Sequence, residues 1–304
     1  MLKTNLFLQK NAKAKGYAVP AFNINNLEIT KAVINTASKM KSPVILQTSE
    51  GAIKYAGMKN LISLAKNAED ENRIPLSLHL DHGQDFDVIR KCIKLGYSSV
   101  MFDGSHMEFK DNVKNTKKVV NLAHKKGISV EGELGVLAGI EENIKSKNHI
   151  YTDPDQAKEF TLKTGVDTLA IAIGTSHGAY KFSGESKLDI KRLKEIEKKV
   201  KTPLVLHGAS GVPEELKKKL LGTGLNIGKA KGVSDQEIRK AVKAGITKVN
   251  IDTDLRLAFT YGLRNFIKKN NEDFDPRKIM KPAMDEIEKV VEAKIKVLGS
   301  NRRY

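Results

Sequence analysis

Short apolar runs typical of strands alternate with longer amphipathic stretches along the chain of 304 residues, and this alternation constrains the fold most. The expected strands are 17–24, 43–49, 76–81, 98–103, 129–134, 166–173, 203–207 and 246–252. Helical spacing follows near 27–40, 56–71, 85–95, 109–126, 154–164, 188–200, 213–221 and 253–269, with a further helix at 276–298. Eight such units without a flexible linker predict one α/β domain over 1–304, a (β/α)8 (TIM) barrel with a C-terminal helical extension. A doubly wound open sheet is the alternative that alternation does not exclude.

The composition is that of an ordinary soluble globular protein, with 40% hydrophobic and 29% charged residues. The N-terminal stretch lacks the apolar core of a signal peptide, and no run approaches the ~18 apolar residues that would cross a bilayer. A single cysteine, Cys92, excludes an internal disulfide. We therefore expect a cytoplasmic protein with no membrane partner.

The formal net charge of +17 would attract polyanions or steer small anionic substrates. However, the lysines are dispersed along expected helices and alternate with acidic residues, as in 188–203. The chain has no Trp, and its Tyr and Phe are scattered, so no aromatic platform for bases is evident. We expect a lysine-rich solvated surface and no nucleic-acid partner.

Polar residues gather where the expected strands end, which is the end of a parallel barrel that carries chemistry. They are Asn23, Ser49, Glu50, Asp81, His82, Asp103, Glu131, Glu133, His177, His207, Asn250, Asp252 and Asp254. Three of the seven histidines are in this set, and they follow three different strands. One such histidine would be explained by a structural hydrogen bond, but three beside carboxylates favour a metal site.

Three neutral imidazoles are a common ligand set for catalytic zinc and leave a position open for substrate. The ion would polarise a carbonyl and stabilise an enolate, leaving Asp81 free for proton transfer. The other histidines have simpler interpretations. We expect His79 to support the site and His106 to make a local hydrogen bond; His124 and His149 are expected at the surface, and Cys92 in a helix core.

Small residues and hydroxyls follow the sixth and seventh strands at 174–184 and 207–213, where backbone N–H groups could approach an anion. Glycines alone are weak evidence, but with Lys181 and the segment 251–256 they indicate a phosphorylated substrate. Two long connections, 135–156 and 223–237, are either mobile functional loops or surface decoration.

Taken together, these motifs resemble class II, metal-dependent fructose-1,6-bisphosphate aldolases. The similarity covers nearly the whole chain through VPAFNINN, HLDHG, SVMFDGSH, EGELGVLAGIEEN, GTSHGAYKF, LHGASGVP, KVNIDTDLRLAF, DPRK and KVLGSN. It implies a homo-oligomeric barrel, dimer or tetramer, that cleaves fructose 1,6-bisphosphate in glycolysis and gluconeogenesis. The products would be dihydroxyacetone phosphate and glyceraldehyde 3-phosphate, formed through a zinc-stabilised enediolate.

The resemblance also implies roles for individual residues. His82, His177 and His207 would bind Zn²⁺, with Asp103 and Glu133 able to hold a second or displaced ion. Asp81 would be the acid/base at the C4 oxygen, and Glu141 or Glu142 would move the proton of dihydroxyacetone phosphate. The 1-phosphate and a monovalent cation (Na⁺ or K⁺) would bind at Gly178, Lys181, Gly208, Ser210 and Thr253. Asn23, Asn250 and Asp252 would surround the sugar hydroxyls, and Ser49, Arg256 and a cross-subunit Arg277 would hold the 6-phosphate.

Three alternatives remain open from the sequence. Tagatose-1,6-bisphosphate aldolase differs at one sugar stereocentre, although Asp252 in the segment 252–254 resembles the fructose-type members. A metal-dependent hydrolase on the same barrel would activate water instead of a carbonyl. A binding protein without catalysis would use the +17 charge on nucleic acid. One departure from the family pattern is Ala138, where many relatives have glycine; it leaves the chemistry intact and bears on the mobility of the following loop.

Overall fold

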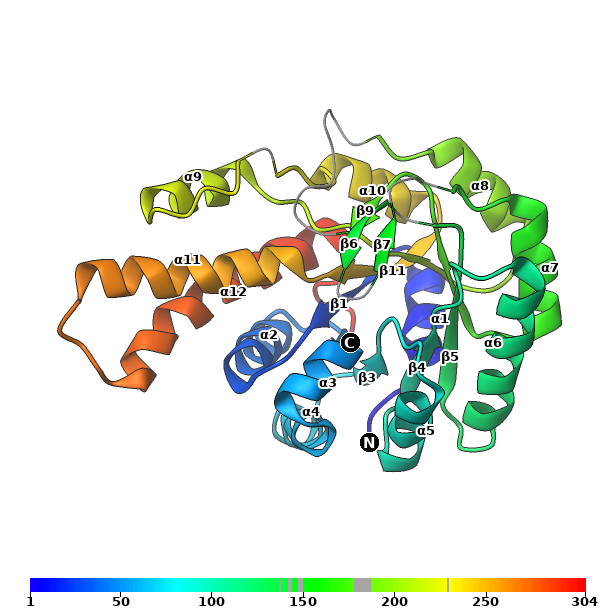
Figure 1. Ribbon diagram of the computed structural model, residues 1–304, viewed down its shortest axis with the longest axis horizontal. Coiled ribbons are helices and arrows are strands. Elements are labelled where there is room, and N and C mark those ends of the chain that lie inside the picture. Colours follow the sequence, from blue (N-terminus) through cyan, green and yellow to red (C-terminus); the bar gives the residue numbers. More distant parts are fainter. Residues whose placement is uncertain (137, 142–143, 147–149, 178–186, 229) are drawn as a thin grey trace.

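The computed structural model describes residues 1–136, 138–141, 144–146, 150–177, 187–228 and 230–304, with the backbone alone for 138–141, 144–146 and 177. Eight parallel strands form a closed barrel in the order β1-β11-β10-β8-β5-β4-β3-β2 (Figure 1). They are β1 (Val19–Asn23), β2 (Val44–Thr48), β3 (Leu76–Leu80), β4 (Ser99–Phe102), β5 (Ser129–Leu134), β8 (Thr168–Ile171), β10 (Leu204–Leu206) and β11 (Ile246–Ile251). The predicted barrel is confirmed, and the open sheet is excluded because β1 pairs with both β2 and β11.

Helices follow the strands, and most of them surround the barrel (Figure 1). They are α2 (Leu27–Lys39), α3 (Glu50–Ala56), α4 (Met58–Asn72), α5 (Phe86–Leu95), α6 (Phe109–His124), α7 (Pro154–Thr164), α8 (Ile190–Lys199), α9 (Glu214–Gly222), α10 (Asp235–Lys243) and α11 (Thr253–Lys269). The expected helix near 56–71 is α4, which Gly57, at φ +83°, separates from α3. Helix α10 was not expected, because its sequence DQEIRKAVK begins inside the connection 223–237.

Helix α1 (Asn5–Lys15) covers the amino ends of the strands. Its buried polar side chains bond to strand residues there: the Ser77 hydroxyl donates to Asn5 Oδ1 (2.6 Å) and the Thr247 hydroxyl donates to Gln9 Oε1 (2.9 Å). The Asn5 backbone N–H also donates to Ser129 Oγ at 3.1 Å. The amino end of the barrel is therefore covered, and the strand carboxyl ends remain for a site.

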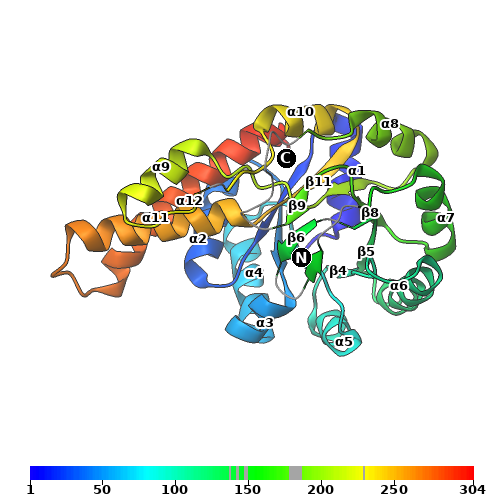
Figure 2. The same ribbon diagram turned by 45° about the horizontal axis from the view of Figure 1, so that its top comes forward.

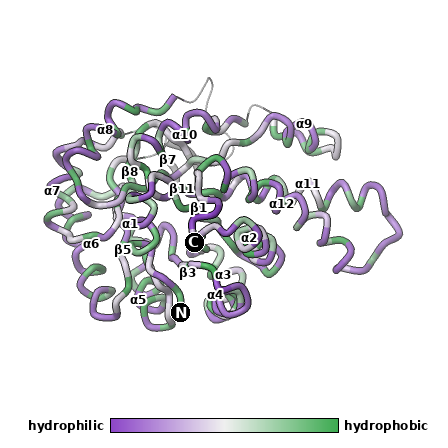
Figure 3. Tube along the Cα trace, turned by 180° about the vertical axis from the view of Figure 1, so that it is seen from behind, coloured by the Kyte–Doolittle hydropathy of each residue, from purple (hydrophilic) through white to green (hydrophobic). Residues whose placement is uncertain are grey.

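Helices α11 and α12 (Pro276–Leu298) form an antiparallel hairpin that extends away from the barrel (Figures 1 and 2). Gly262 allows the two helices to pack closely against each other, because a Cβ there would lie 2.5 Å from the Pro282 carbonyl oxygen. Hydrophilic residues dominate the far end of the hairpin (Figure 3). No helix in the described part of the chain is both long and apolar enough to span a membrane.

A small second sheet joins part of the connection 135–156, which we expected to be a long loop, to the segment that follows β8. Its order is β7 (Ile144–Ser146), β6 (Ala138–Glu141) and β9 (Ser176–His177). Strand β6 is parallel to β9, with Gly139 opposite His177. The backbone of two predicted site segments, around 138–141 and at 177, is thereby brought together.

Candidate metal centre

The turn that follows β3 delivers an acid and an imidazole to the barrel mouth. Asp81 continues the strand pairing through its N–H, which donates to the Thr48 carbonyl at 3.0 Å. His82 then adopts φ +48°, a left-handed conformation that is rare for a non-glycine residue and clusters at functional sites. Gly83 is required next, since a Cβ there would lie 2.6 Å from the Met101 carbonyl oxygen. This sharp turn explains the sequence Asp81-His82-Gly83.

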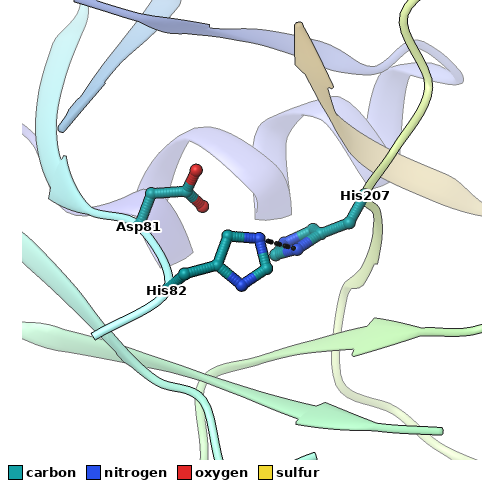
Figure 4. Close-up of side chains that lie close together, drawn as sticks. All are labelled: Asp81, His82 and His207. Carbon is teal, nitrogen blue, oxygen red and sulfur yellow. Dashed lines mark hydrogen bonds between the residues drawn. The ribbon is translucent and has the colours of Figure 1, made fainter. Parts of the chain in front are cut away.

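The rings of His82 and His207 meet edge to face (Figure 4). His82 Nε2 and His207 Nδ1 are 3.1 Å apart, with ring centroids separated by 4.7 Å and planes at 77°. His207 follows β10 directly, so two imidazole nitrogens from opposite sides of the barrel point to one place. Asp81 lies beside them, and its carboxylate completes a group whose ligand atoms all lie within 4.8 Å of one another (Figure 4).

The buried ion pair between Glu131 and Lys248 orients His207. Its Nε2 is 2.8 Å from Glu131 Oε1, so the carboxylate holds the proton on Nε2 and leaves Nδ1 facing His82. Lys248 Nζ lies 3.1 and 2.9 Å from the two Glu131 oxygens, with neither side chain exposed. Burial alone would raise the pKa of Glu131. The charge of Lys248 and the hydrogen bond from His207 have the larger effect and hold it below its usual value, so Glu131 is ionised. Lys248 was not anticipated, although strand alternation places it on the same face of β11 as Asn250.

The other side of the centre is rich in carboxylates around His82. Its Nδ1 is 2.8 Å from Asp103 Oδ2 and 3.8 Å from Glu133 Oε2, and these three residues form a second possible metal group. Burial lowers the pKa of His82, but the charges of Asp81 and Asp103 raise it to about 10. Burial and the neighbouring Asp103 charge raise the pKa of Glu133 well above its usual range. The carboxylates of Asp103 and Glu133 therefore favour a cation, such as a metal ion, beside them.

These observations fit a divalent ion. Adjacent nitrogens around a tetrahedral ion, each ~2.0–2.1 Å from it, are about 3.4 Å apart. The 3.1 Å between His82 Nε2 and His207 Nδ1 is close to that spacing. Glu133 Oε2 is buried without a hydrogen-bond partner among the described residues, which makes it a further available donor. The residues that would hold the ion are thus His82 and His207, with Asp103 and Glu133 beside them.

Three side-chain amides hold Asp81 as a carboxylate. Asn250 Nδ2 donates to Oδ1 at 3.0 Å, while Asn23 Nδ2 and Gln47 Nε2 donate to Oδ2, each at 3.1 Å. Burial raises the pKa of Asp81, but His82, His207 and Lys248 lower it below its usual value. Asp81 can therefore accept a proton. Gln47 was missed by sequence reasoning, since it lies in an otherwise apolar strand; its polar side chain within β2 was the available signal.

The phosphate-binding residues predicted after the last two barrel strands are brought together in part. Ser210 Oγ accepts a hydrogen bond from the Asp252 N–H at 3.3 Å, and Thr253 is the first residue of α11. Gly208, at φ +60°, packs so closely that a Cβ would lie 2.6 Å from the Ser176 carbonyl oxygen. Arg256 forms an ion pair with Asp252 (Nη2–Oδ2 2.8 Å), which places its guanidinium at the same junction.

The remaining predicted residues lie elsewhere. Ser49 is buried and caps α3, accepting from the Ala52 N–H at 3.2 Å. Arg277 is 89% exposed near the start of α12 and pairs with Asp275, so this chain does not bring it to its own barrel mouth. The backbones of Glu141 and His177 are in β6 and β9, but their side chains are not described. Glu142, His149, Gly178 and Lys181 lie outside the described residues.

The structure agrees with the simpler interpretations of His79, His124 and Cys92, while the local hydrogen bond expected of His106 stays a prediction. His79 is buried, with Nδ1 2.9 Å from Ser99 Oγ and Nε2 3.7 Å from Glu131, and burial lowers its pKa to about 3. His106 is exposed, and His124 pairs at the surface with Asp167 (2.8 Å). Cys92 is buried in α5, where burial raises its thiol pKa to about 12.

Comparisons with known proteins identify the family of this chain. The family model described as fructose-bisphosphate aldolase class II matches residues 4–303. A fructose-bisphosphate aldolase of Thermus caldophilus is 48% identical over 302 residues, covering 99% of both chains. One of Helicobacter pylori is 45% identical over 303 residues, covering 99% of this chain and 98% of its own.

Solved structures give the same result. The YdjI aldolase from Escherichia coli K12 matches with a TM-score of 0.79 at 30% identity, covering 100% of this chain and 99% of its own. A fructose-bisphosphate aldolase from Campylobacter jejuni matches with a TM-score of 0.77 at 26% identity, over 98% and 95% of the two chains. Family members use a divalent metal, as the residues around His82 and His207 would allow. The chain therefore belongs to the class II fructose-bisphosphate aldolase family.

Proposed function

We propose that this protein catalyses the reversible aldol cleavage of fructose 1,6-bisphosphate to dihydroxyacetone phosphate and glyceraldehyde 3-phosphate. The observation that carries the proposal is the convergence of His82 Nε2 and His207 Nδ1, 3.1 Å apart, beside a carboxylate held by three amides. The names of the relatives, fructose-bisphosphate aldolases at 48% and 45% identity, support the choice of substrate.

The proposed metal is zinc, held by His82, His177 and His207, with Asp103 and Glu133 available for a second or displaced position. When bound, zinc acts as a Lewis acid that polarises the substrate carbonyl and stabilises the negative charge that develops there. Two nitrogen ligands within the described residues match the preference of zinc for imidazole. A monovalent cation, Na⁺ or K⁺, is proposed beside the 1-phosphate.

Asp81 is the proposed base in the cleavage direction. It accepts the proton of the C4 hydroxyl as the bond between C3 and C4 breaks, and it returns that proton to the aldehyde oxygen in condensation. Amide donors from Asn23, Gln47 and Asn250 favour its charged form and fix its direction. Cleavage leaves negative charge on the three-carbon fragment that carries the 1-phosphate, and Glu141 or Glu142 is the proposed source of the proton that neutralises it.

The two phosphates are assigned to two different sets of residues. Gly178, Lys181, Gly208, Ser210 and Thr253 are proposed for the 1-phosphate, and Asn23, Asn250 and Asp252 for the sugar hydroxyls. Ser49, Arg256 and an Arg277 from a second copy of the chain are proposed for the 6-phosphate, so the active form is a homodimer or homotetramer. Arg277 being 89% exposed on the projecting hairpin supports this assignment. We place the enzyme in the cytoplasm.

A coupled triose-phosphate assay tests the proposal. We expect chelation by EDTA to abolish cleavage of fructose 1,6-bisphosphate and zinc to restore it. Full activity in chelator, with a borohydride-trapped lysine adduct, would indicate Schiff-base chemistry instead. Release of inorganic phosphate without triose phosphates would indicate a hydrolase. Tagatose 1,6-bisphosphate is run in parallel, and faster turnover of that sugar would reverse the substrate assignment.

A further inference from the structure

The loop after His207 contains an unexplained strained residue. Val212 has φ +47°, a conformation in which a β-branched side chain is a clear outlier. Such a conformation is energetically unfavourable and persists only where surrounding contacts enforce it. The same loop, 207–213, carries Gly208 and Ser210, so whatever enforces it also sets their positions. His207, at its start, is held separately by Glu131 at 2.8 Å.

A single buried carboxylate enforces this conformation. Asp254 Oδ2 accepts from the Gly211 N–H and Oδ1 from the Val212 N–H, both at 2.8 Å. Asp254 is fully buried in the first turn of α11. It is the last acid of the segment 252–254, and the proposed chemistry leaves it without a role. Its two oxygens hold two consecutive amides in one orientation.

A lysine from the C-terminal helix neutralises Asp254. Lys294 Nζ is 3.1 Å from Asp254 Oδ2 and 3.3 Å from Asp235 Oδ1, and the Lys294 side chain is 9% exposed. A buried carboxylate without such a partner would be strongly destabilised. The end of α12 that carries Lys294 passes beside α10, whose first residue is Asp235 (Figure 2). Lys294 thus links three helices to one loop.

The other side of the loop is equally confined. The Val233 N–H donates to the Ser210 carbonyl at 3.1 Å, and a Cβ at Gly232 would lie 2.1 Å from that oxygen. The Asp252 N–H donates to Ser210 Oγ at 3.3 Å. Because the segment around 232 packs against one side of the loop and Asp254 holds the other, a shift of Asp254 would move Gly208 and Ser210.

We infer that Lys294, acting through Asp254, is a positioning residue for the phosphate group of the three-carbon ketone substrate. This inference rests on the proposed function, in which Gly208 and Ser210 bind the 1-phosphate. Lys294 touches neither substrate nor metal in this role. It fixes Asp254, which fixes the amides of Gly211 and Val212 and thereby the shape of the loop.

The test is the condensation reaction of the zinc-loaded enzyme, in which the two phosphates arrive on different substrates. Lys294→Met should raise KM for dihydroxyacetone phosphate about tenfold, the effect of a loss of about 1.4 kcal/mol in binding. KM for glyceraldehyde 3-phosphate and kcat should change less than about twofold. Lys294→Arg, which keeps the charge, should restore most of the affinity. Lys296→Met is the matched control, since Lys296 is 62% exposed on the same helix and pairs with the surface residue Glu292.

Calorimetric titration with dihydroxyacetone phosphate gives a second readout, and it does not require turnover. If Lys294→Met does not fold, the double variant Asp254→Asn/Lys294→Met, which removes both buried charges, decides the question by the same titration. Affinity equal to that of Lys296→Met in the folded variant would overturn the inference. Failure of the unmodified protein to cleave fructose 1,6-bisphosphate would instead overturn the proposed function.

Discussion

Removing Lys248 is expected to destabilise the barrel through the charge it leaves behind. Lys248 Nζ contacts both oxygens of Glu131, at 2.9 and 3.1 Å, where neither side chain is exposed. Breaking such a buried pair costs about 3–5 kcal/mol, mainly because the remaining charge is uncompensated. An unfolding entropy of ~2.1 cal/mol/K per residue gives ~640 cal/mol/K for 304 residues. Lys248→Met should therefore lower Tm by about 5–8 °C.

Removing both charges should cost much less. In Glu131→Gln/Lys248→Met, the Gln carbonyl can still accept from His207 Nε2, and no buried charge is left unpaired. We expect most of the lost Tm to return. Lys163→Met is the surface control, because the Lys163–Glu159 pair is 57% and 48% exposed and should change Tm by less than about 2 °C. The measurement is calorimetric unfolding of the metal-free protein. A double variant less stable than Lys248→Met would refute the reasoning.

Three further predictions concern protons. Asp81→Ala should retain zinc by elemental analysis yet lose about 10²–10⁴-fold in kcat, and full activity would contradict its role as base. Because the pKa of His82 is about 10, zinc binding at pH 7.5 should release at least one proton, measured by calorimetry in buffers of different ionisation enthalpy; release of none would contradict a protonated His82. His79 has a pKa of about 3 when folded against about 6.5 when unfolded, so the unfolded chain binds the extra proton and stability falls as pH falls between these values. From pH 6.5 to 5.5 this term is about 1 kcal/mol, and His79→Gln should lack it; an unchanged slope would exclude His79 as the source.

The barrel could be predicted because each strand is a local pattern. Eight apolar runs bounded by polar residues locate the strands, and their carboxyl ends locate Asp81, His82 and His207. Gln47 and Lys248 could have been found by counting two residues at a time. Gln47 lies two residues before Ser49, which directly follows β2, and Lys248 lies two residues before Asn250 in β11. The apolar neighbours along both strands obscured this alternation.

Other features depend on partners that a local pattern does not contain. Asp254 and Lys294 are separated by 40 positions, and only the packing of α12 brings them together. The pairing of β6 with β9 joins residues near 138 and 176, and no local signal sets that register. The left-handed conformation of Val212 is likewise imposed from outside, since valine alone would avoid it.

The position of α1 over the amino end of the strands determines how metal and substrate reach the site. Asn5 and Gln9 bond to Ser77 and Thr247 at that end. The ion, the sugar and both products would therefore all enter and leave at the carboxyl end of the strands. A sugar bound at this end would lie between the ion and the bulk solution. A chelator should therefore remove zinc more slowly from the substrate-saturated enzyme than from the substrate-free enzyme.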